Sequence, residues 1–113
     1  MSDFDRPELD AVVASPEHHR LLMENEHVRV LETLIRPGET TALHTHQWPA
    51  ATTFLSSSAV VRRDQAGNIL LDTRGMEPMA AMSAAWTPQL GPHTLENVGT
   101  NNVHVVTVEI KRA

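Results

Sequence analysis

Short runs of strand-forming residues, each followed by a turn signal, fill most of this chain. The clearest run is 103–110, which is rich in β-branched residues and follows the turn-forming segment 99–102. Comparable runs lie at 20–23, 28–35, 41–46, 52–55, 59–63, 69–72 and 94–98. Turn signals recur about every 8–12 residues, and no segment has a convincing helical period. The pattern predicts an all-β sandwich or barrel of about eight or nine strands.

Glycine and proline mark the predicted connections. Pro37-Gly38 is suited to a type II turn, and 64–68 is predicted to close a hairpin between the two flanking runs. Residues 75–85 are harder to place, because Pro78 opposes a regular helix there. We expect the flexible thioethers of this segment to fill the core or to pack as a lid. These methionines are Met76, Met79 and Met82.

The composition narrows the possible functions. A chain of 113 residues suits one modest core, with residues 1–19 expected as an N-terminal arm and 20–113 as one domain. Cysteine and tyrosine are absent, which excludes disulfides, thiolate ligands and any mechanism that uses a protein phenol. A net charge of −5 without a basic stripe argues against nucleic-acid binding. No run approaches the roughly 20 apolar residues of a membrane helix, and the acidic N-terminus does not resemble a signal peptide, so we expect a cytoplasmic protein.

Three histidines carry the strongest chemical signal. His44 and His46 are separated by one residue, so in an extended strand both imidazoles point to the same face, about 7 Å apart along the strand. His93 lies far downstream, in a segment that another strand could bring alongside. Three neutral imidazoles that converge make a metal site with positions left for water or substrate. The spacing therefore predicts a divalent transition-metal site, and iron, zinc, nickel and copper all suit imidazole ligands.

Two separated segments resemble the sequence motifs of the cupin superfamily. Gly38, His44 and His46 match the first cupin motif, while Pro88, His93 and Asn97 match the second in the expected order. The resemblance extends over most of the chain, from about 20 to 112. It implies a double-stranded β-helix, or jelly-roll barrel, in which the three histidines hold a metal.

The resemblance is incomplete at one ligand. Cupins have a glutamate four or five residues after the His-x-His pair, where this chain has Ala50 and Ala51. Alignment on the following aromatic residue, Phe54, makes Ala51 the expected replacement. Without that carboxylate, three neutral histidines leave the full charge on the ion and one more open position.

Cupins with three histidine ligands suggest two function classes. The first is a small metal-dependent enzyme, dioxygenase-like or an isomerase or lyase, that acts on a chelating oxygen-containing small molecule. The alternative is a non-catalytic module that binds a metal or small ligand. Open metal positions beside an ionisable side chain would favour the enzyme, whereas a tetrahedral shell closed by a fourth protein ligand, such as His104, would contradict it.

Candidates for proton transfer are few. Glu32 shares strand parity with apolar neighbours, so an inward position would raise its pKa, and His104 shares parity with Val106 and Val108. We therefore consider Glu32 and His104 as possible catalytic residues. Glu96 is expected to form an outward salt bridge, and Asn97 to fix the turn behind His93.

The remaining polar and aromatic residues have simpler expectations. The two histidines before the first strand and the one in the following turn are predicted to be exposed: His18, His19 and His27. Gln47, Trp48 and Trp86 could line the mouth of the site or pack at edges. Exposed strand edges and the arm suggest a homodimer, since small barrels manage their edges by pairing or covering them.

Overall fold

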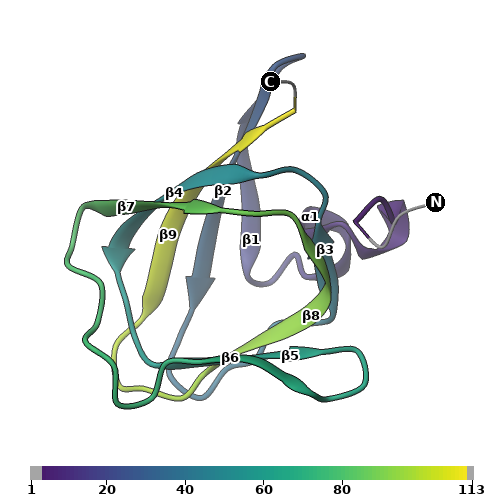
Figure 1. Ribbon diagram of the computed structural model, residues 1–113. Helices are drawn as coiled ribbons and strands as arrows, with labels where there is room; N and C mark the ends of the chain where they lie inside the picture. Colours follow the sequence, from purple (N-terminus) through teal and green to yellow (C-terminus); the bar gives the residue numbers. More distant parts are fainter. Residues whose placement is uncertain (1–3, 112–113) are drawn as a thin grey trace.

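Nine strands form two antiparallel sheets that face each other in the computed structural model, which describes residues 4–111 (Figure 1). The five-stranded sheet has the order β1-β2-β9-β4-β7, and the four-stranded sheet has the order β3-β8-β5-β6. This confirms the all-β prediction. The strands are β1 His19–Glu24, β2 Val28–Ile35, β3 His44–His46, β4 Ala50–Ser56, β5 Val60–Asp64, β6 Ile69–Asp72, β7 Ser83–Thr87, β8 Leu90–Asn97 and β9 Val103–Ile110.

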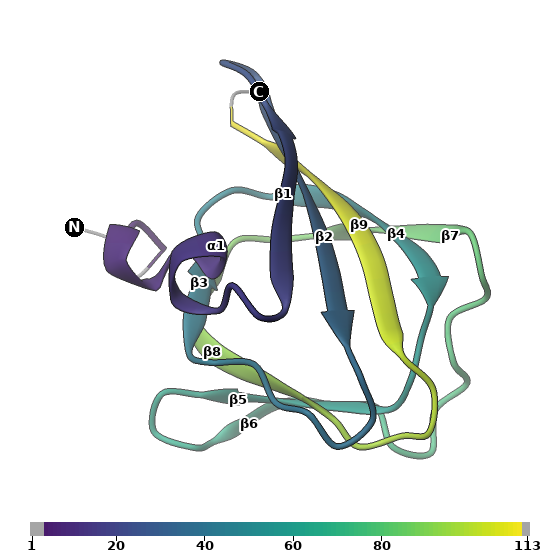
Figure 2. The ribbon, with the colours of Figure 1, turned by 180° about the vertical axis from the view of Figure 1, so that it is seen from behind.

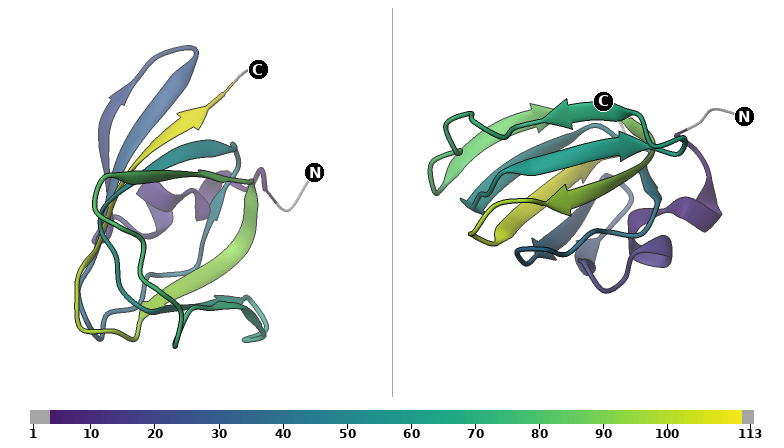
Figure 3. Two further views of the ribbon diagram at one scale, coloured as in Figure 1. Left: turned by 60° about the vertical axis from the view of Figure 1, so that its left-hand side comes forward. Right: turned by 90° about the horizontal axis from the view of Figure 1, so that it is seen from below.

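The core lies between the two sheets, which Figure 3 shows as layers. Burial alternates along β2, and the buried row includes Leu31 and Ile35. Val103 and Val105 supply the corresponding row of β9, and Val60 and Leu95 line the interior from the second sheet. Because successive strand residues point to opposite faces, this alternation sets which side chains reach the interior.

The predicted turns form where the sequence places them. Gly38 has a φ of 84°, and the Glu39 amide donates to the Arg36 carbonyl over 3.0 Å, as a type II turn requires. The hairpin at 64–68 joins β5 to β6, with Gly67 at a φ of 91°. The Asp64 carboxylate accepts hydrogen bonds from backbone amides across this turn.

The segment 75–85 differs from the expectation for its methionines. They are 63%, 42% and 71% exposed for Met76, Met79 and Met82, so they do not fill the core. The chain runs along the surface here, and the strand β7 begins at Ser83. Met76 and Met79 nonetheless line a cavity between the sheets, which agrees with the alternative expectation of a lid.

The N-terminal arm packs on the body next to β3, as Figure 2 shows from behind. It contains a 3-10 turn, Pro7–Leu9, and one helical turn, α1 Ala11–Ala14. Asp10 caps α1 by accepting from the Val12 amide, and it also bridges to Thr45 of β3. Among residues 4–111, no helix is long and apolar enough to span a membrane. The arm thus touches the strand that carries the His-x-His pair.

Candidate metal centre

The pairing of β3 with β8 places His44 directly opposite His93. The two ring centroids are 4.3 Å apart, and both side chains are almost completely buried. The ring of His46 lies 4.9 Å from that of His44 and 5.5 Å from that of His93. The three histidines singled out from the sequence therefore lie together in the interior.

His19 joins this cluster, although the sequence led us to expect an exposed residue. It is the first residue of β1 and is 4% exposed, with its ring centroid 4.6 Å from that of His44. One ligand atom from each of His19, His44 and His46 lies within 4.8 Å of the other two. The expectation was wrong because the turn after α1 directs the chain inward: the His19 amide donates to the Ser15 carbonyl over 3.1 Å.

The Nδ1 atoms of the four rings are all held by acceptors. Those of His19, His44 and His93 lie 3.0, 2.8 and 2.7 Å from the carbonyl oxygens of nearby residues, which are Ser15, Ala42 and Gly91. Nδ1 of His46 lies 3.4 Å from a carboxylate oxygen of Glu109. A carbonyl oxygen can only accept, so Nδ1 carries the proton in these pairs and Nε2 keeps its lone pair. This is the arrangement that orients histidine as a metal ligand.

Burial keeps the imidazoles of His19, His44 and His93 neutral. Desolvation, followed by the positive charge that His46 would carry, lowers the pKa of His19 to about 4. Burial likewise lowers the pKa of His93 to about 3, and it lowers that of His44 further still. Near neutral pH these three rings therefore offer unprotonated nitrogen atoms. Their residue type and tautomer suit a divalent transition metal, and the spacing of ligand atoms fits one for His19, His44 and His46.

A buried ion network lies behind His46. Glu109 is fully buried and accepts a hydrogen bond from Nε of Arg29 over 2.6 Å. Arg29 in turn donates from both terminal nitrogens to the carboxylate of Asp10, at 2.7 and 3.0 Å. These carboxylates raise the pKa of Arg29 against the opposing effect of burial. The network links the N-terminal arm to the histidine cluster, and its members were not identified from the sequence.

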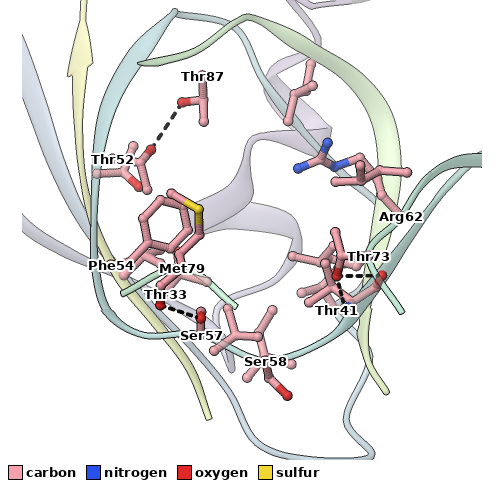
Figure 4. A pocket seen from close by; sticks show the side chains of 18 of the residues that line it. Thr33, Thr41, Thr52, Phe54, Ser57, Ser58, Arg62, Thr73, Met79 and Thr87 are labelled. Atoms are coloured by element: carbon pink, nitrogen blue, oxygen red, sulfur yellow. Dashed lines mark hydrogen bonds between the residues drawn. The ribbon is translucent and has the colours of Figure 1, made fainter. Parts of the chain in front are cut away.

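A cavity of about 580 Å³ opens next to the histidines. All four rings contribute to its wall, and most of the remaining lining is apolar, with Phe54, Leu71 and Val105 as examples. Threonine hydroxyls are interspersed, and the Oγ1 atoms of Thr52 and Thr87, on the paired strands β4 and β7 of one wall, lie 3.1 Å apart, as Figure 4 shows. Its volume lies within the range of small-molecule sites. A small organic ligand therefore has room beside the histidines.

The two candidate catalytic residues lie outside this cavity. Glu32 and His104 pair with each other on the outer face of the five-stranded sheet, with His104 Nε2 2.8 Å from a Glu32 oxygen. That contact, followed by Arg20, lowers the pKa of Glu32, contrary to the expected increase. The parity prediction was wrong because both rows of these strands carry apolar residues. The inward row is the one that contains Leu31 and Val105.

The structure also revises the position of the missing glutamate. Ala50 is 3% exposed and lines the cavity, whereas Ala51 is exposed and pairs with Trp86 on the outer side. Phe54 shares the parity of Ala50 and lies on the same wall. Ala50, not Ala51, therefore faces the place where a cupin carboxylate was expected.

Other expectations are confirmed in part. Glu96 forms the outward salt bridge with Arg63 at 2.8 Å, and His27 is exposed. Asn97 is buried and donates to the carbonyls of Ile35 and Asn101, so it fixes the turn after β8.

Three residues were expected either to line the mouth of the site or to pack at edges, and one of them lies at the cavity. Trp48 lines the cavity, while Gln47 and Trp86 do not. His18, which was expected to be exposed, is half-buried and lies 3.6 Å from a Glu39 oxygen.

Solved structures with the cupin fold resemble this chain. A cupin domain from Bordetella pertussis Tohama I gives a TM-score of 0.66 at 19% identity, covering 83% of this chain and 92% of that one. An RmlC-like cupin from Methanocaldococcus jannaschii gives 0.56 at 13% identity, covering 81% and 77%. The polyketide cyclase RemF from Streptomyces resistomycificus gives 0.57 at 18% identity, covering 99% and 80%. No family model and no curated protein matches the sequence. The likeness confirms the predicted double-stranded β-helix fold.

Proposed function

We propose that this protein holds a divalent transition metal in its histidine cluster and uses it to bind a chelating, oxygen-containing small molecule. The ligands would be His19, His44, His46 and His93. The observation that carries the proposal is the set of four Nδ1 contacts, which direct the Nε2 lone pairs away from the surrounding backbone. A core without a metal would gain nothing from burying four imidazoles in this way.

The number of histidines favours one reaction class. An ion with six positions keeps two of them after four imidazoles have bound, and a bidentate substrate fills both. A dioxygenase that also binds O2 at the metal would need a third open position. We therefore favour a redox-neutral isomerase or lyase over the dioxygenase-like reaction that three histidines suggested. When bound, the metal would supply Lewis acidity that polarises a carbonyl oxygen.

The residues of the chain have distinct tasks in such a reaction. Buried, neutral imidazoles stay available without competing protons, because the pKa values of His19 and His93 lie far below neutrality. The Glu109 carboxylate holds His46 in place. The apolar wall that includes Phe54 and Val105 limits water around the substrate, which strengthens electrostatic interactions at the reacting oxygen.

One structural neighbour is compatible with this class of chemistry. RemF is described as a polyketide cyclase, and 99% of the present chain superposes on it. Polyketides carry repeated carbonyl groups that can chelate a metal. This supports a dicarbonyl or hydroxy-carbonyl compound as the first class of substrate to examine.

The alternative is a non-catalytic module in which four histidines close a tetrahedral shell. Replacement of the metal by Co²⁺ separates the two, because tetrahedral cobalt absorbs visible light far more strongly than six-coordinate cobalt. We expect a weak six-coordinate spectrum that changes when pentane-2,4-dione is added and stays constant with non-chelating butan-2-one. An intense tetrahedral spectrum that neither compound alters would favour the non-catalytic module.

We also propose that the chain forms a homodimer through the edge strand β1. The β1–β2 hairpin extends beyond the barrel in Figure 3, and Leu21, Leu22 and Met23 of β1 are 43–47% exposed. Covering such an edge is a common reason for pairing. Size-exclusion chromatography with light scattering should give a molar mass of twice the chain mass for the wild type. The Leu22→Lys variant should give the mass of a monomer. A monomeric wild type would contradict this assembly.

A further inference from the structure

One half-buried arginine inside the cavity has no carboxylate partner among residues 4–111. Arg62 lies on β5 and lines the cavity, with its side chain extending inward from the wall opposite Thr52 and Phe54 (Figure 4). Its Nε is shielded from solvent and has no hydrogen-bond partner among residues 4–111. Within the same part of the chain, no carboxylate lies within 4.0 Å of its guanidinium. Burying an unpaired polar group in this way is costly, so a bound ligand would be expected to satisfy it.

Two other arginines, each paired with a carboxylate, contrast with the unpaired guanidinium of Arg62. Arg29 is more deeply buried than Arg62, and it pairs with both Asp10 and Glu109. Arg63, the next residue along β5, points outward and pairs with Glu96. Burial lowers the pKa of Arg62, and no carboxylate offsets this effect. Arg62 is therefore a cation held in the cavity without a protein counter-charge.

Strand pairing places this cation close to the proposed metal site. Arg62 is directly opposite Leu95 of β8, and His93 lies two positions earlier on the same strand. Diagonal neighbours of this kind are about 7–8 Å apart across an antiparallel pair, within reach of a long side chain. A small molecule in the cavity could therefore contact the guanidinium and the histidine cluster at once.

The charges point to the nature of that molecule. Four neutral imidazoles leave the full charge on a divalent ion, and Arg62 adds a further positive charge nearby. The buried carboxylate of Glu109 is already balanced by Arg29. Glu77 lines the cavity at an exposed position, away from any contact with Arg62. The interior is thus complementary to an anion with an apolar body.

We propose that Arg62 is the anion-binding residue of the cavity and that the natural ligand is a small, mostly apolar organic acid. Its carboxylate or enolate would pair with the guanidinium, while a second oxygen faces the histidines. The second contact rests on the proposed metal function, whereas the first does not. Arginine suits this task because its planar fork can bind a carboxylate through two hydrogen bonds.

The test compares naphthalene-2-carboxylate with naphthalene-2-carboxamide, its uncharged analogue, by calorimetric titration. We expect the wild type to bind the carboxylate about tenfold more tightly or better, as expected for a charge-assisted hydrogen bond in a buried site. Arg62→Met should abolish the preference, and Arg62→Lys should retain part of it. Arg63→Met is the matched control, because that arginine lies on the outer face, and it should leave both affinities unchanged.

Titrating the metal-free and the metal-loaded protein separates this inference from the proposed function. A carboxylate preference that persists in a protein unable to hold metal would support Arg62 while contradicting the metal site. If the protein binds metal but binds the two probes with equal affinity, the role of Arg62 is contradicted and the metal site is not. Retention of the preference in Arg62→Met, or no binding of either probe, would also overturn the inference. If that variant does not fold, the comparison of the two probes on the metal-free wild type still decides, because no ion is then present to favour the carboxylate.

Discussion

Nδ1 of His46 lies 3.4 Å from Oε2 of Glu109, a carboxylate with no exposed surface. The other oxygen of Glu109 accepts a hydrogen bond from Arg29, which also pairs with Asp10 of the N-terminal arm. The orientation of one proposed metal ligand is thus tied to residues near both ends of the described chain. A carboxylate behind a histidine fixes its tautomer and increases its basicity as a ligand.

Replacing this carboxylate should weaken metal binding. Glu109→Gln keeps the size of the side chain but removes the charge that faces His46, so we expect metal affinity to fall about 10–100-fold. Competition with a chromophoric chelator measures the change. Glu96→Gln is the control, because Glu96 forms a partly exposed pair with Arg63. Equal affinities of Glu109→Gln and the wild type would show that Glu109 does not position the ligand.

Asp10 should stabilise the fold through its charge and not through its role as a helix cap. Asn is as good an N-cap as Asp, so Asp10→Asn keeps the contact with the Val12 amide but loses the paired charge facing Arg29. We expect the free energy of unfolding, measured in urea, to fall by about 2 kcal/mol, since a largely buried arginine loses one of its two counter-charges. An unchanged midpoint would mean that Glu109 alone balances Arg29.

The metal-free protein should lose stability as the pH falls below about 6.5. The pKa of His19 is about 4 and that of His93 about 3 in the fold, against 6.5 for an ordinary histidine. Below pH 6.5 these histidines bind protons in the unfolded chain but not in the folded chain. The free energy of unfolding is therefore highest above pH 6.5 and falls until the pH reaches the folded-state pKa values of about 4 and 3. Each histidine contributes up to about 1.4 kcal/mol per pH unit.

Urea unfolding of the metal-free protein at pH 7.5, 6.5 and 5.5 measures this effect. We expect the free energy of unfolding to fall by about 2 kcal/mol or more between pH 6.5 and 5.5. His19→Ala removes one of the titrating rings and should make the dependence shallower. A free energy that stays constant over this range would contradict the burial of neutral histidines.

The sequence predicts the fold better than it predicts the faces of the strands. His44, His46 and His93 could be placed together because their spacing and motif context are local signals. Glu32 and His104 were assigned to the wrong face, because the outer row of the five-stranded sheet also carries valines such as Val30 and Val106. Hydrophobic parity is a weak guide where both faces of a strand are apolar.

The missed site residues depend on contacts that no local pattern reveals. His19 becomes buried through the turn after α1, and the link between Arg29 and Glu109 joins strands that are distant in the sequence. One signal was present: a missing carboxylate beside three preserved histidine ligands suggests a substitute elsewhere in the chain. A histidine just before the first strand was a candidate for that substitute.

The proposed replacement of the carboxylate by His19 can be tested with a designed pair of variants. Ala50 faces the cavity and lies opposite Glu109 in the pairing of β4 with β9. We expect His19→Ala to lose metal affinity and the added Ala50→Glu to restore at least tenfold of it, because the new carboxylate would offer an oxygen ligand from the cavity wall. Ala51→Glu, which places the same group outside, should restore nothing. Equal behaviour of the two double variants in chelator competition would contradict the assignment of Ala50.

In the proposed metal centre, His19 is the fourth histidine ligand. X-ray absorption at the metal edge, combined with elemental analysis of protein purified without an affinity tag, tests it most directly. We predict about one ion per chain in the wild type, with four imidazoles around it. His19→Ala should show three imidazoles or lose the metal, as should His93→Ala, while the exposed His27→Ala should match the wild type. A wild-type ion with three imidazoles, unchanged in His19→Ala, would contradict the account.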